Sequence, residues 1–597
     1  MIRYQISSLN PATHYFEITL LIDSPDPAGQ CLRMPNWIPG SYMIRDFAKN
    51  IVTMNAYCGD QSITIKQQDK SNWRLEPCAG PVTIDYRVYA WDLSVRGAHL
   101  DQTHGYYNGT SVFLEVIGQS QEPCEVLIEK PSADYCVDWK LATTLPIKDS
   151  SAFEFGLYQV SDYDELIDHP VEMGNFTQIR FEACGVPHDV ILTGRFRCDQ
   201  NRLKKDLTRI CEHHIRFFGE PAPMDYYQFQ VIVVGQGNGG LEHRSSTSLM
   251  CARDSLPQPG QTDVSDAYRD FLGLCSHEYF HTWNVKRIKP AVYQPYDLQQ
   301  EVYTELLWAF EGITSYYDDL ALVRCGLIEQ KSYLELLAQT ITRVKRGKGS
   351  TRQSAAESSF NTWTKFYKQD ENAQNAIVSY YAKGSLIALC IDLKMRQLSQ
   401  ARCGLDDVMR QLWLEWKETG AGTDSNTIQD LVCSIVGEDI HDFMHQLIYC
   451  VDELPLQALF NSVGIEMSLR PASNQKDKGG KVSEEPLPAV DLGAFIQENN
   501  GGLEILRVSE GGSAQAAGLS ANDSIIAVNG LKLNMAQLEQ QLALATVGDE
   551  WRIHVFRRDE LMEFELILAA TRNDTVVLLA DEPDRHRQAW LLGRVNG

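Results

Sequence analysis

The chain has 597 residues, of which 44% are hydrophobic and 22% charged, a balance typical of globular proteins with several domains. Its 54 basic and 79 acidic side chains give a formal charge of −25. Nucleic acids and anionic membranes bind clustered Lys and Arg, so this charge balance disfavours both as partners.

Two further features bear on location. The sequence has no run of eighteen apolar residues and no basic start followed by an apolar stretch, so we expect neither a membrane span nor a secretory signal. The fifteen cysteines form no C-x-x-C pair. They are interpreted as reduced thiols, which predicts a cytoplasmic protein.

Residues 1–170 predict β structure. Short stretches of alternating polar and apolar residues, such as 15–20 and 82–88, are separated by Gly, Pro, Asn and Asp. A β-sandwich is the expected result.

The centre of the chain changes to a helical pattern. We expect a helix over 203–218, a strand over 229–234 and a glycine-rich turn over 235–240. Residues 263–449 are predicted to be mainly helical, with Asp263 or Ser265 capping the first helix. Further helices are expected over 298–323 and 379–398.

The most informative motif is His277-Glu278-x-x-His281. Residues four apart share one face of a helix, so both imidazoles can bind one metal ion, and Glu278 can reach a water on that ion. Apolar neighbours such as Phe271 and Trp283 indicate a buried face, where two His and one Glu are costly unless something pairs them. Two surface histidines on an ordinary amphipathic helix are the alternative. Because the buried face favours the metal site over this alternative, we predict one Zn²⁺ ion per chain.

A catalytic zinc site needs three protein ligands and one open position. Glu311, within the apolar stretch 308–314, is the predicted third ligand. Glu305 lies six residues earlier, roughly 240° round a helix, so only one of the two can face the ion. Glu301 and Glu305 share a more polar side and are interpreted as solvated charges.

Four motifs together resemble those of the gluzincin peptidases. H-E-x-x-H is followed by W-x-x-E-G at Trp308–Gly312, where the Glu of that family is the third zinc ligand. Residues 239–243 resemble the G-x-M-E-N segment of gluzincin aminopeptidases, with His243 where Asn is usual. Residues 381–384 resemble the Y-x-K-G motif. Taken singly, the last two segments are as typical of a β-turn and of a helix N-terminus.

This resemblance implies roles for further residues. Glu242 would bind the α-amine of the substrate, within a substrate-binding segment that also holds Gly239, Gly240 and His243. Tyr381 would stabilise the tetrahedral intermediate, and Glu278 would act as the catalytic general base. An amine-binding carboxylate implies an exopeptidase, because an endopeptidase has no substrate terminus to bind.

A closer resemblance covers nearly the whole chain. Two stretches are similar to the glycyl aminopeptidase family. They are residues 35–47, which begin Pro35-Asn36-Trp37, and the sequence H-E-Y-F-H-x-W-N-V-K-R-I, which starts at His277. Its members carry a β-rich N-terminal domain, a thermolysin-like catalytic domain and a C-terminal PDZ domain. The resemblance implies a small first residue in the substrate, Gly or Ala.

The C-terminal part resembles a bacterial-type PDZ domain. This resemblance rests on residues 511–519 and 522–530, with Asn522 where Gly is usual. Asn also accepts a positive φ. Residues 460–469 are a candidate first strand of this module. A loop that binds a peptide or protein C-terminus, or else a plain strand start, is expected at Leu492, Gly493, Ala494 and Phe495.

The predicted fold is therefore multidomain α+β. We expect an N-terminal β-sandwich (1–170), a mainly helical thermolysin-like zinc peptidase domain (171–454), and a PDZ-like β domain (455–575) with a polar insertion near 474–488, followed by a tail (576–597). The predicted function is a zinc aminopeptidase acting on peptides with a free N-terminus. The alternatives are a zinc endopeptidase with a PDZ domain and a PDZ scaffold with an idle zinc domain. Glu278 and Tyr381 favour an enzyme, since an idle site has no need of them.

Overall fold

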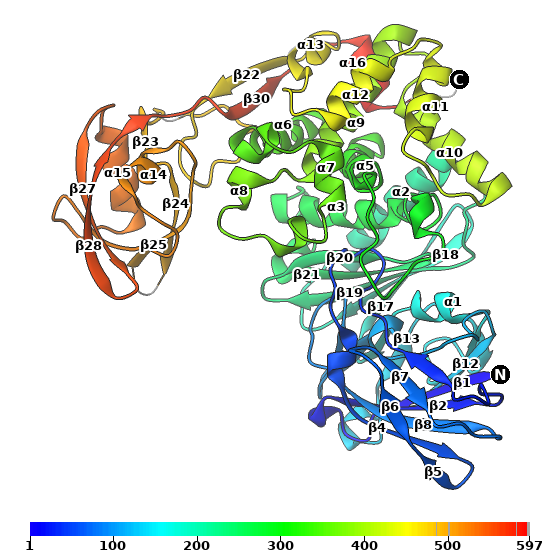
Figure 1. The fold of residues 1–597 in the computed structure, drawn as a ribbon. Coiled ribbons are helices and arrows are strands. Elements are labelled where there is room, and N and C mark those ends of the chain that lie inside the picture. The colour runs from blue at the N-terminus through cyan, green and yellow to red at the C-terminus, as the bar shows by residue number, and fades with distance from the viewer. Residues whose placement is uncertain (485, 500–501, 581, 594–597) are drawn as a thin grey trace. The chain divides into compact units, whose positions relative to one another are not determined.

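The computed structural model describes residues 1–597 apart from 485, 500–501, 581 and 594–597 (Figure 1). The chain forms two compact units. The first comprises Met1–Val302 and Leu412–Thr423, and the second Tyr303–Gln411 and Asp424–Gly597. The predicted domain limits stay predictions. Residue 485 of the predicted insertion, and 581 and 594–597 of the predicted tail, lie outside the described residues.

The N-terminal part of the first unit is built from three sheets, which confirms a β-rich N-terminal domain. An eight-stranded sheet has the order β14-β15-β12-β1-β2-β8-β4-β5. In β2, buried residues alternate with partly exposed ones along the strand, as expected when one face covers a core. The strands of this sheet are β1 (Ile2–Ser7), β2 (Tyr15–Ile22), β4 (Ile51–Cys58), β5 (Gln61–Ile63), β8 (Val82–Tyr89), β12 (Cys124–Ile128), β14 (Ile147–Asp149) and β15 (Gly156–Val160).

Two four-stranded sheets complete this part, with the orders β13-β16-β10-β9 and β11-β3-β7-β6. A short helix, α1 (Tyr163–Ile167), precedes β16. The strands are β3 (Cys31–Arg33), β6 (Ile65–Gln67), β7 (Asn72–Leu75), β9 (Ala98–Leu100), β10 (His104–Tyr107), β11 (Glu115–Val116), β13 (Lys140–Ala142) and β16 (Val171–Gly174).

A five-stranded sheet and two helices form the rest of the first unit. The sheet order is β17-β18-β19-β21-β20: β17 (Thr177–Ala183), β18 (Val186–Thr193), β19 (Tyr227–Val234), β20 (Asn238–Glu242) and β21 (Ser246–Ala252). Strands β18, β19 and β21 are parallel, and β19 is buried along seven of its eight residues, as central parallel strands are. Helices α2 (Gln200–Phe218) and α3 (Asp266–Phe280) follow β18 and β21.

The expected glycine-rich turn is wrong in its second half. Residues 238–242 form the edge strand β20, antiparallel to β21, and therefore extend the sheet. Ser265 caps α3, as one of the two predicted candidates, by accepting the N–H of Tyr268. Helix α3 ends at Phe280, so His281 is its C-cap residue, although its backbone is still helical (φ −60°, ψ −19°). The spacing of the two histidines is preserved.

The second unit is mainly helical. Its helices are α4 (Leu307–Phe310), α5 (Gly312–Arg324), α6 (Gln330–Arg346), α7 (Ala355–Phe360), α8 (Ala373–Ala376), α9 (Tyr380–Ser399), α10 (Leu405–Thr419, whose residues from Leu412 belong to the first unit), α11 (Thr427–Val436), α12 (His441–Tyr449), α13 (Leu456–Asn461) and α16 (Arg585–Leu591). The prediction of a helix over 379–398 is confirmed by α9. Most of its residues are buried, which makes it a core helix of this unit.

The predicted helix over 298–323 is wrong at its start. The chain becomes helical only at Leu307, and Glu311 interrupts it as the C-cap of α4 and the N-cap of α5. Thr304 accepts the N–H of Leu306 with its hydroxyl, a local turn that competes with helix formation. Glu305 therefore lies ahead of the helix, and the rotational argument against it does not apply.

A PDZ module follows the helices. Its five-stranded sheet has the order β24-β25-β26-β27-β28: β24 (Ala494–Asn499), β25 (Gly502–Val508), β26 (Ser524–Val528), β27 (Glu550–Arg557) and β28 (Glu560–Ile567). Helices α14 (Ser513–Ala517) and α15 (Met535–Leu544) and the short pair β23 (Val490–Asp491) and β29 (Ala569–Ala570) complete it. Asn522 has φ +69°, as the sequence led us to expect.

The candidate first strand of this module is wrong. Within 460–469, helix α13 extends to Asn461, Gly464 has φ +65°, and a strand begins only at Glu466. This strand, β22 (Glu466–Arg470), pairs with β30 (Thr575–Leu579) in a sheet of its own. The five-stranded sheet therefore lies in the chain between two strands that pair with each other.

One stretch differs from the expectation about membranes. Residues Ala373–Ser399 are long and apolar enough to cross a membrane by length and composition. Within the protein, 78% of their most apolar window is buried, and a core helix passes the same test.

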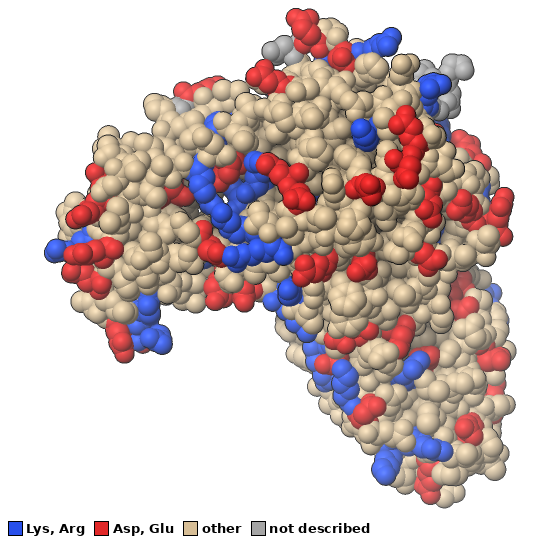
Figure 2. All heavy atoms as spheres, turned by 45° about the horizontal axis from the view of Figure 1, so that its top comes forward, with Lys and Arg blue, Asp and Glu red and all other residues tan. Residues whose placement is uncertain are grey.

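On the face shown in Figure 2, Asp and Glu side chains are widely scattered, and Lys and Arg lie among them in separate groups.

Candidate active site

Both histidines of the H-E-x-x-H motif lie at the C-terminal end of α3. Their ring centroids are 4.6 Å apart, and the planes are nearly perpendicular. Nδ1 of His281 lies 2.6 Å from the carbonyl oxygen of Asn284, the arrangement in which Nδ1–H donates and the Nε2 lone pair is available to a metal. His281 is buried, and His277 is partly exposed. This donor pair fits a metal ion.

Glu278 packs directly on the edge strand β20. A β-carbon added to Gly240 would lie 2.0 Å from Oε1 of Glu278, so a larger residue there would displace the Glu278 side chain. One ligand atom from each of Glu242, Glu278 and His281 lies within 4.8 Å of the others. The structure thus brings the predicted general base and the predicted amine-binding residue next to His281.

Glu242 is a buried carboxylate, and one of its oxygens lacks a hydrogen-bond donor among the described residues. Its side chain is at the end of β20, and the residue is 4% exposed. Among the residues that the structure describes, its Oε1 accepts no hydrogen bond. A buried carboxylate oxygen without a donor is costly, and a substrate ammonium would provide that donor.

The N-terminal motif at residues 35–47 contributes to this site. Gly40, with φ +90°, lies so close to Glu242 that an added β-carbon would be 2.5 Å from Oε2. Trp37 donates its indole N–H to the carbonyl of Asp297, and Asn36 donates its backbone N–H to Leu298. In the sequence this motif supported only the family resemblance, and its position beside Glu242 was not predicted.

A buried ion cluster holds the chain after α3. Asp168 contacts Nζ of Lys286 at 2.7 Å and Nδ1 of His243 at 3.3 Å, and accepts the backbone N–H of Arg244 at 3.0 Å. Burial alone would raise the pKa of Asp168, but Lys286, Arg244 and His243 hold it well below its usual value. His243, predicted to bind substrate, therefore bonds Asp168 through Nδ1.

Arg287 fixes the same segment. Its guanidinium donates to the carbonyl oxygens of Thr282, Arg244 and Pro223. Lys286 and Arg287 are the K-R of the motif that starts at His277. Their contacts hold the residues that follow His281 against the sheet region. Asp168, Lys286 and Arg287 were missed by sequence analysis, and the Lys-Arg pair was the available signal.

In the second unit, two glycines bring two predicted motifs together. A β-carbon on Gly384 would lie 3.0 Å from Cα of Gly312 and 2.7 Å from the carbonyl oxygen of Trp308. Helix α9 therefore crosses the α4–α5 junction at backbone contact, and both glycines are required for it. As a result, Glu311 of W-x-x-E-G lies close enough to Tyr380, the first residue of α9, to affect its pKa.

Two tyrosines begin α9, and they differ in exposure. Tyr380 is fully buried, and its hydroxyl lies 3.0 Å from that of Thr362. Burial, and then the charges of Tyr367 and Glu311, raise the pKa of Tyr380 well above its usual value. Tyr381 is partly exposed, its hydroxyl is 3.4 Å from that of Tyr367, and its ring stacks on Tyr380. Of the two, Tyr381 is the one open to a substrate.

The three predicted metal ligands, His277, His281 and Glu311, form one of the groups among the described residues that can hold a metal ion. Two imidazoles and one carboxylate are the donor set of a catalytic zinc site. Glu311 is 2% exposed, and a bound cation would stabilise its buried charge.

Comparisons with known proteins agree with this arrangement. The family model for the Peptidase M61 N-terminal domain matches residues 3–175, the model for M61 glycyl aminopeptidase matches 270–387, and a PDZ model matches 481–555. A crystal structure of an aminopeptidase N family protein from Idiomarina loihiensis is 43% identical, with a TM-score of 0.96 over 99% of this chain and 100% of its own. The chain belongs to the M61 glycyl aminopeptidase family.

Other comparisons add little to the M61 assignment. An M1 zinc metallopeptidase from Deinococcus radiodurans is 12% identical, with a TM-score of 0.47 over 76% of this chain and 94% of its own. No curated protein matches the chain. Membership of the M61 family makes the protein a metallopeptidase of the aminopeptidase type, and the family and the His/Glu group together imply zinc.

The PDZ module of this M61 protein has a distinctive edge. Strand β24 is the edge of its sheet in the described residues, where a bound peptide strand would pair. The N–H of Ile496 on β24 donates to Oε1 of Gln475 at 2.7 Å, and the N–H of Gly493 donates to Oδ1 of Asp491 at 3.0 Å. The predicted terminus-binding loop therefore has at least one of its N–H groups already bonded within the chain.

Proposed function

We propose that the protein is a zinc-dependent aminopeptidase that removes a small N-terminal residue, Gly or Ala, from peptides. The observation that carries the aminopeptidase assignment is the buried carboxylate of Glu242, whose Oε1 accepts no hydrogen bond among the described residues and which lies beside Glu278 and His281. The name of the matching family, glycyl aminopeptidase, supports the small first residue.

His277, His281 and Glu311 would hold the zinc ion. A zinc ion there supplies Lewis acidity, which polarises the scissile carbonyl and acidifies water. Glu278 accepts a proton from the attacking water and returns it to the leaving amine. The Tyr381 hydroxyl donates a hydrogen bond to the oxygen on which negative charge develops.

Glu242 sets where the chain is cut. Its carboxylate binds the substrate ammonium, and Gly40 and Gly240 allow the Glu242 and Glu278 carboxylates to pack directly on the backbone. Since the anchor is the terminal amine, the scissile bond is the first peptide bond. This arrangement favours an exopeptidase over the endopeptidase and scaffold alternatives.

The decisive experiment compares Gly- and Ala-amide fluorogenic substrates with their Nα-acetylated forms, with and without a chelator. We expect hydrolysis only of the free amines, and loss of it with the chelator. Glu242→Gln should raise KM for free amines by at least tenfold with kcat less affected. Glu301→Gln, at a partly exposed carboxylate that our assignment leaves out, is the control. Equal cleavage of acetylated substrates would replace the aminopeptidase by an endopeptidase.

A further inference from the structure

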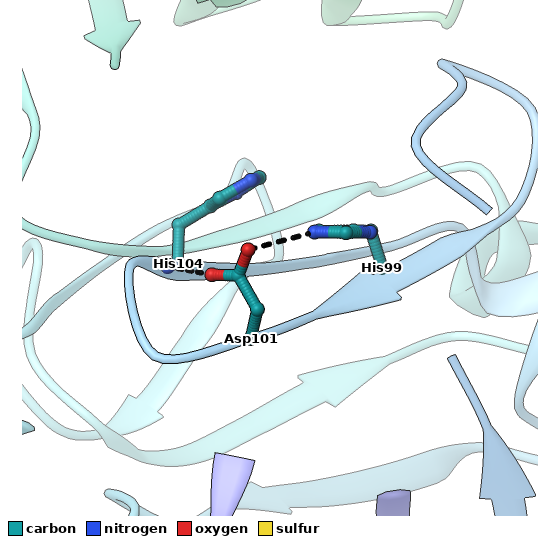
Figure 3. Close-up of side chains that lie close together, drawn as sticks. All are labelled: His99, Asp101 and His104. Carbon is teal, nitrogen blue, oxygen red and sulfur yellow. Dashed lines mark hydrogen bonds and ion pairs between the residues drawn. The ribbon is translucent and has the colours of Figure 1, made fainter. Parts of the chain in front are cut away.

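A second group of metal-ligating side chains lies in the N-terminal β domain, on the hairpin formed by β9 and β10. His99 belongs to β9, Asp101 to the turn, and His104 begins β10 (Figure 3). One ligand atom from each residue lies within 4.8 Å of the others. Figure 3 shows the Asp101 carboxylate directed at the His99 ring, with the His104 ring beside them.

The two oxygens of the Asp101 carboxylate have different neighbours. Oδ1 accepts the backbone N–H of Thr103 and of His104 and the Thr103 hydroxyl. The other oxygen, Oδ2, faces Nε2 of His99 at 3.3 Å.

His104 is oriented by a buried carboxylate behind it. Its Nδ1 lies 3.2 Å from Oε1 of Glu172 on β16, and Glu172 is 1% exposed and also accepts the Thr193 hydroxyl. With Nδ1–H donating to Glu172, Nε2 keeps a lone pair that can bind a metal ion. A carboxylate that orients a histidine in this way is the usual support of a metal ligand.

The spacing is also that of two ligands on one metal ion. A nitrogen and an oxygen bound to one tetrahedral zinc ion at about 2.0–2.1 Å lie about 3.3 Å apart, as His99 Nε2 and Asp101 Oδ2 do. The side chains of His99 and His104 are 5% and 8% exposed, whereas that of Asp101 is 27% exposed. The group is therefore desolvated on the histidine side and open to an ion on the Asp101 side.

We propose that His99, Asp101 and His104 bind a second divalent transition-metal ion of the zinc type, with Glu172 as a positioning residue. Its donor set of two imidazoles and one carboxylate is selective for such ions over Mg²⁺ or Ca²⁺. The bound ion would link the two strands of the β9–β10 hairpin at its turn.

The hairpin is connected to the predicted amine-binding strand. Tyr106 on β10 donates its hydroxyl to Ser248 on β21 at 2.7 Å. Arg96, just before β9, donates to the carbonyl oxygen of Gly240 on β20 at 3.2 Å. Binding at the turn would therefore stiffen the element that supports the Gly240 backbone, apart from any role of the catalytic group.

The test counts metal ions in the full chain. Protein stripped with a chelator is titrated with Zn²⁺ by calorimetry and with Co²⁺ by its visible absorption. We expect two equivalents for the wild type and one for His281→Ala. In the His281→Ala background, Asp101→Asn, which keeps the turn-forming oxygen, and His104→Ala should remove the remaining equivalent. Glu172→Gln should weaken it by about 10–100-fold.

His441→Ala is the matched control, because His441 belongs to a partly exposed Cys433–Asp439–His441 group that also offers three ligands. It should leave both equivalents. The proposal is overturned if the His281→Ala protein binds no ion, or if its ion survives Asp101→Asn and His104→Ala, or disappears with His441→Ala. Since that background already lacks a catalytic ligand, none of these outcomes depends on peptidase activity.

Discussion

Gly240 and Glu278 are in contact: a β-carbon on the glycine would lie 2.0 Å from Oε1 of the glutamate. The glycine lies in an edge strand and the glutamate at the end of α3, so the contact fixes where the proton acceptor of the proposed mechanism lies relative to the amine-binding strand.

Gly240→Ala should therefore displace the Glu278 carboxylate by about 1 Å, a shift that can cost roughly 100-fold in rate. We expect kcat/KM for Gly-amide hydrolysis to fall by that order, with bound zinc unchanged by metal analysis. Gly80→Ala is the control, because its added carbon would meet only Sγ of Cys58 at 3.5 Å, away from the site. Equal activity of the two variants would show that the contact does not position Glu278.

The contact between Gly312 and Gly384 predicts an effect on stability. A β-carbon on Gly384 would meet backbone atoms of Trp308 and Gly312, which cannot retreat as a flexible side chain can. We expect Gly384→Ala to lower the free energy of unfolding by about 1–3 kcal/mol, in spite of the better helix propensity of alanine. Chemical denaturation measures this, and Gln397→Ala, exposed on the same helix, should change it little. A Gly384→Ala protein as stable as the wild type would show that the helices can separate.

His188 predicts acid sensitivity. Burial lowers its pKa from 6.5 to about 4, and its ring nitrogens lie 2.8 Å from the Val186 carbonyl oxygen and 2.9 Å from the Tyr279 hydroxyl. Between pH 6.5 and 4 the unfolded chain binds a proton here that the folded chain does not, so stability falls as the pH falls through this window. The loss amounts to about 3 kcal/mol at pH 4.

Chemical denaturation at pH 7.5, 5.5 and 4 measures this loss. His188→Gln should abolish this part of the pH dependence, whereas the control His445→Gln, at an exposed histidine, should keep it. Parallel pH curves for the wild type and His188→Gln would contradict the assignment.

The Gln475 side chain should compete with a bound peptide for the edge strand of the PDZ module. A peptide strand that pairs with β24 must displace its carboxamide from the Ile496 N–H. One such hydrogen bond contributes about 0.5–1.5 kcal/mol, so Gln475→Ala should tighten binding of C-terminal peptides about threefold to tenfold. Fluorescence anisotropy with a peptide library measures this, with Gln457→Ala on α13 as the control. Weaker binding by Gln475→Ala would mean that this side chain supports the groove instead.

The contrast between His277 and Gly240 shows what could be predicted from the sequence. The spacing of His277 and His281, the Ser265 cap and helix α9 follow from local patterns, and the structure has them as expected. The run 235–240 was expected to be a turn because glycine favours turns, yet Gly240 is needed for the approach of Glu278, a residue remote in sequence. Likewise, Asp168 has no local signal, because its partners Lys286 and Arg244 come from other segments.

The pairing of β22 with β30 has a consequence for the history and the engineering of this chain. Arg470 and Thr575 are partners in that ladder, so the intervening residues leave and rejoin the helical part at neighbouring points. A segment whose two ends meet in this way can be gained, lost or exchanged in one genetic event without breaking the remaining fold. Joining Arg470 to Thr575 by a short turn is accordingly the natural route to a peptidase without its PDZ module.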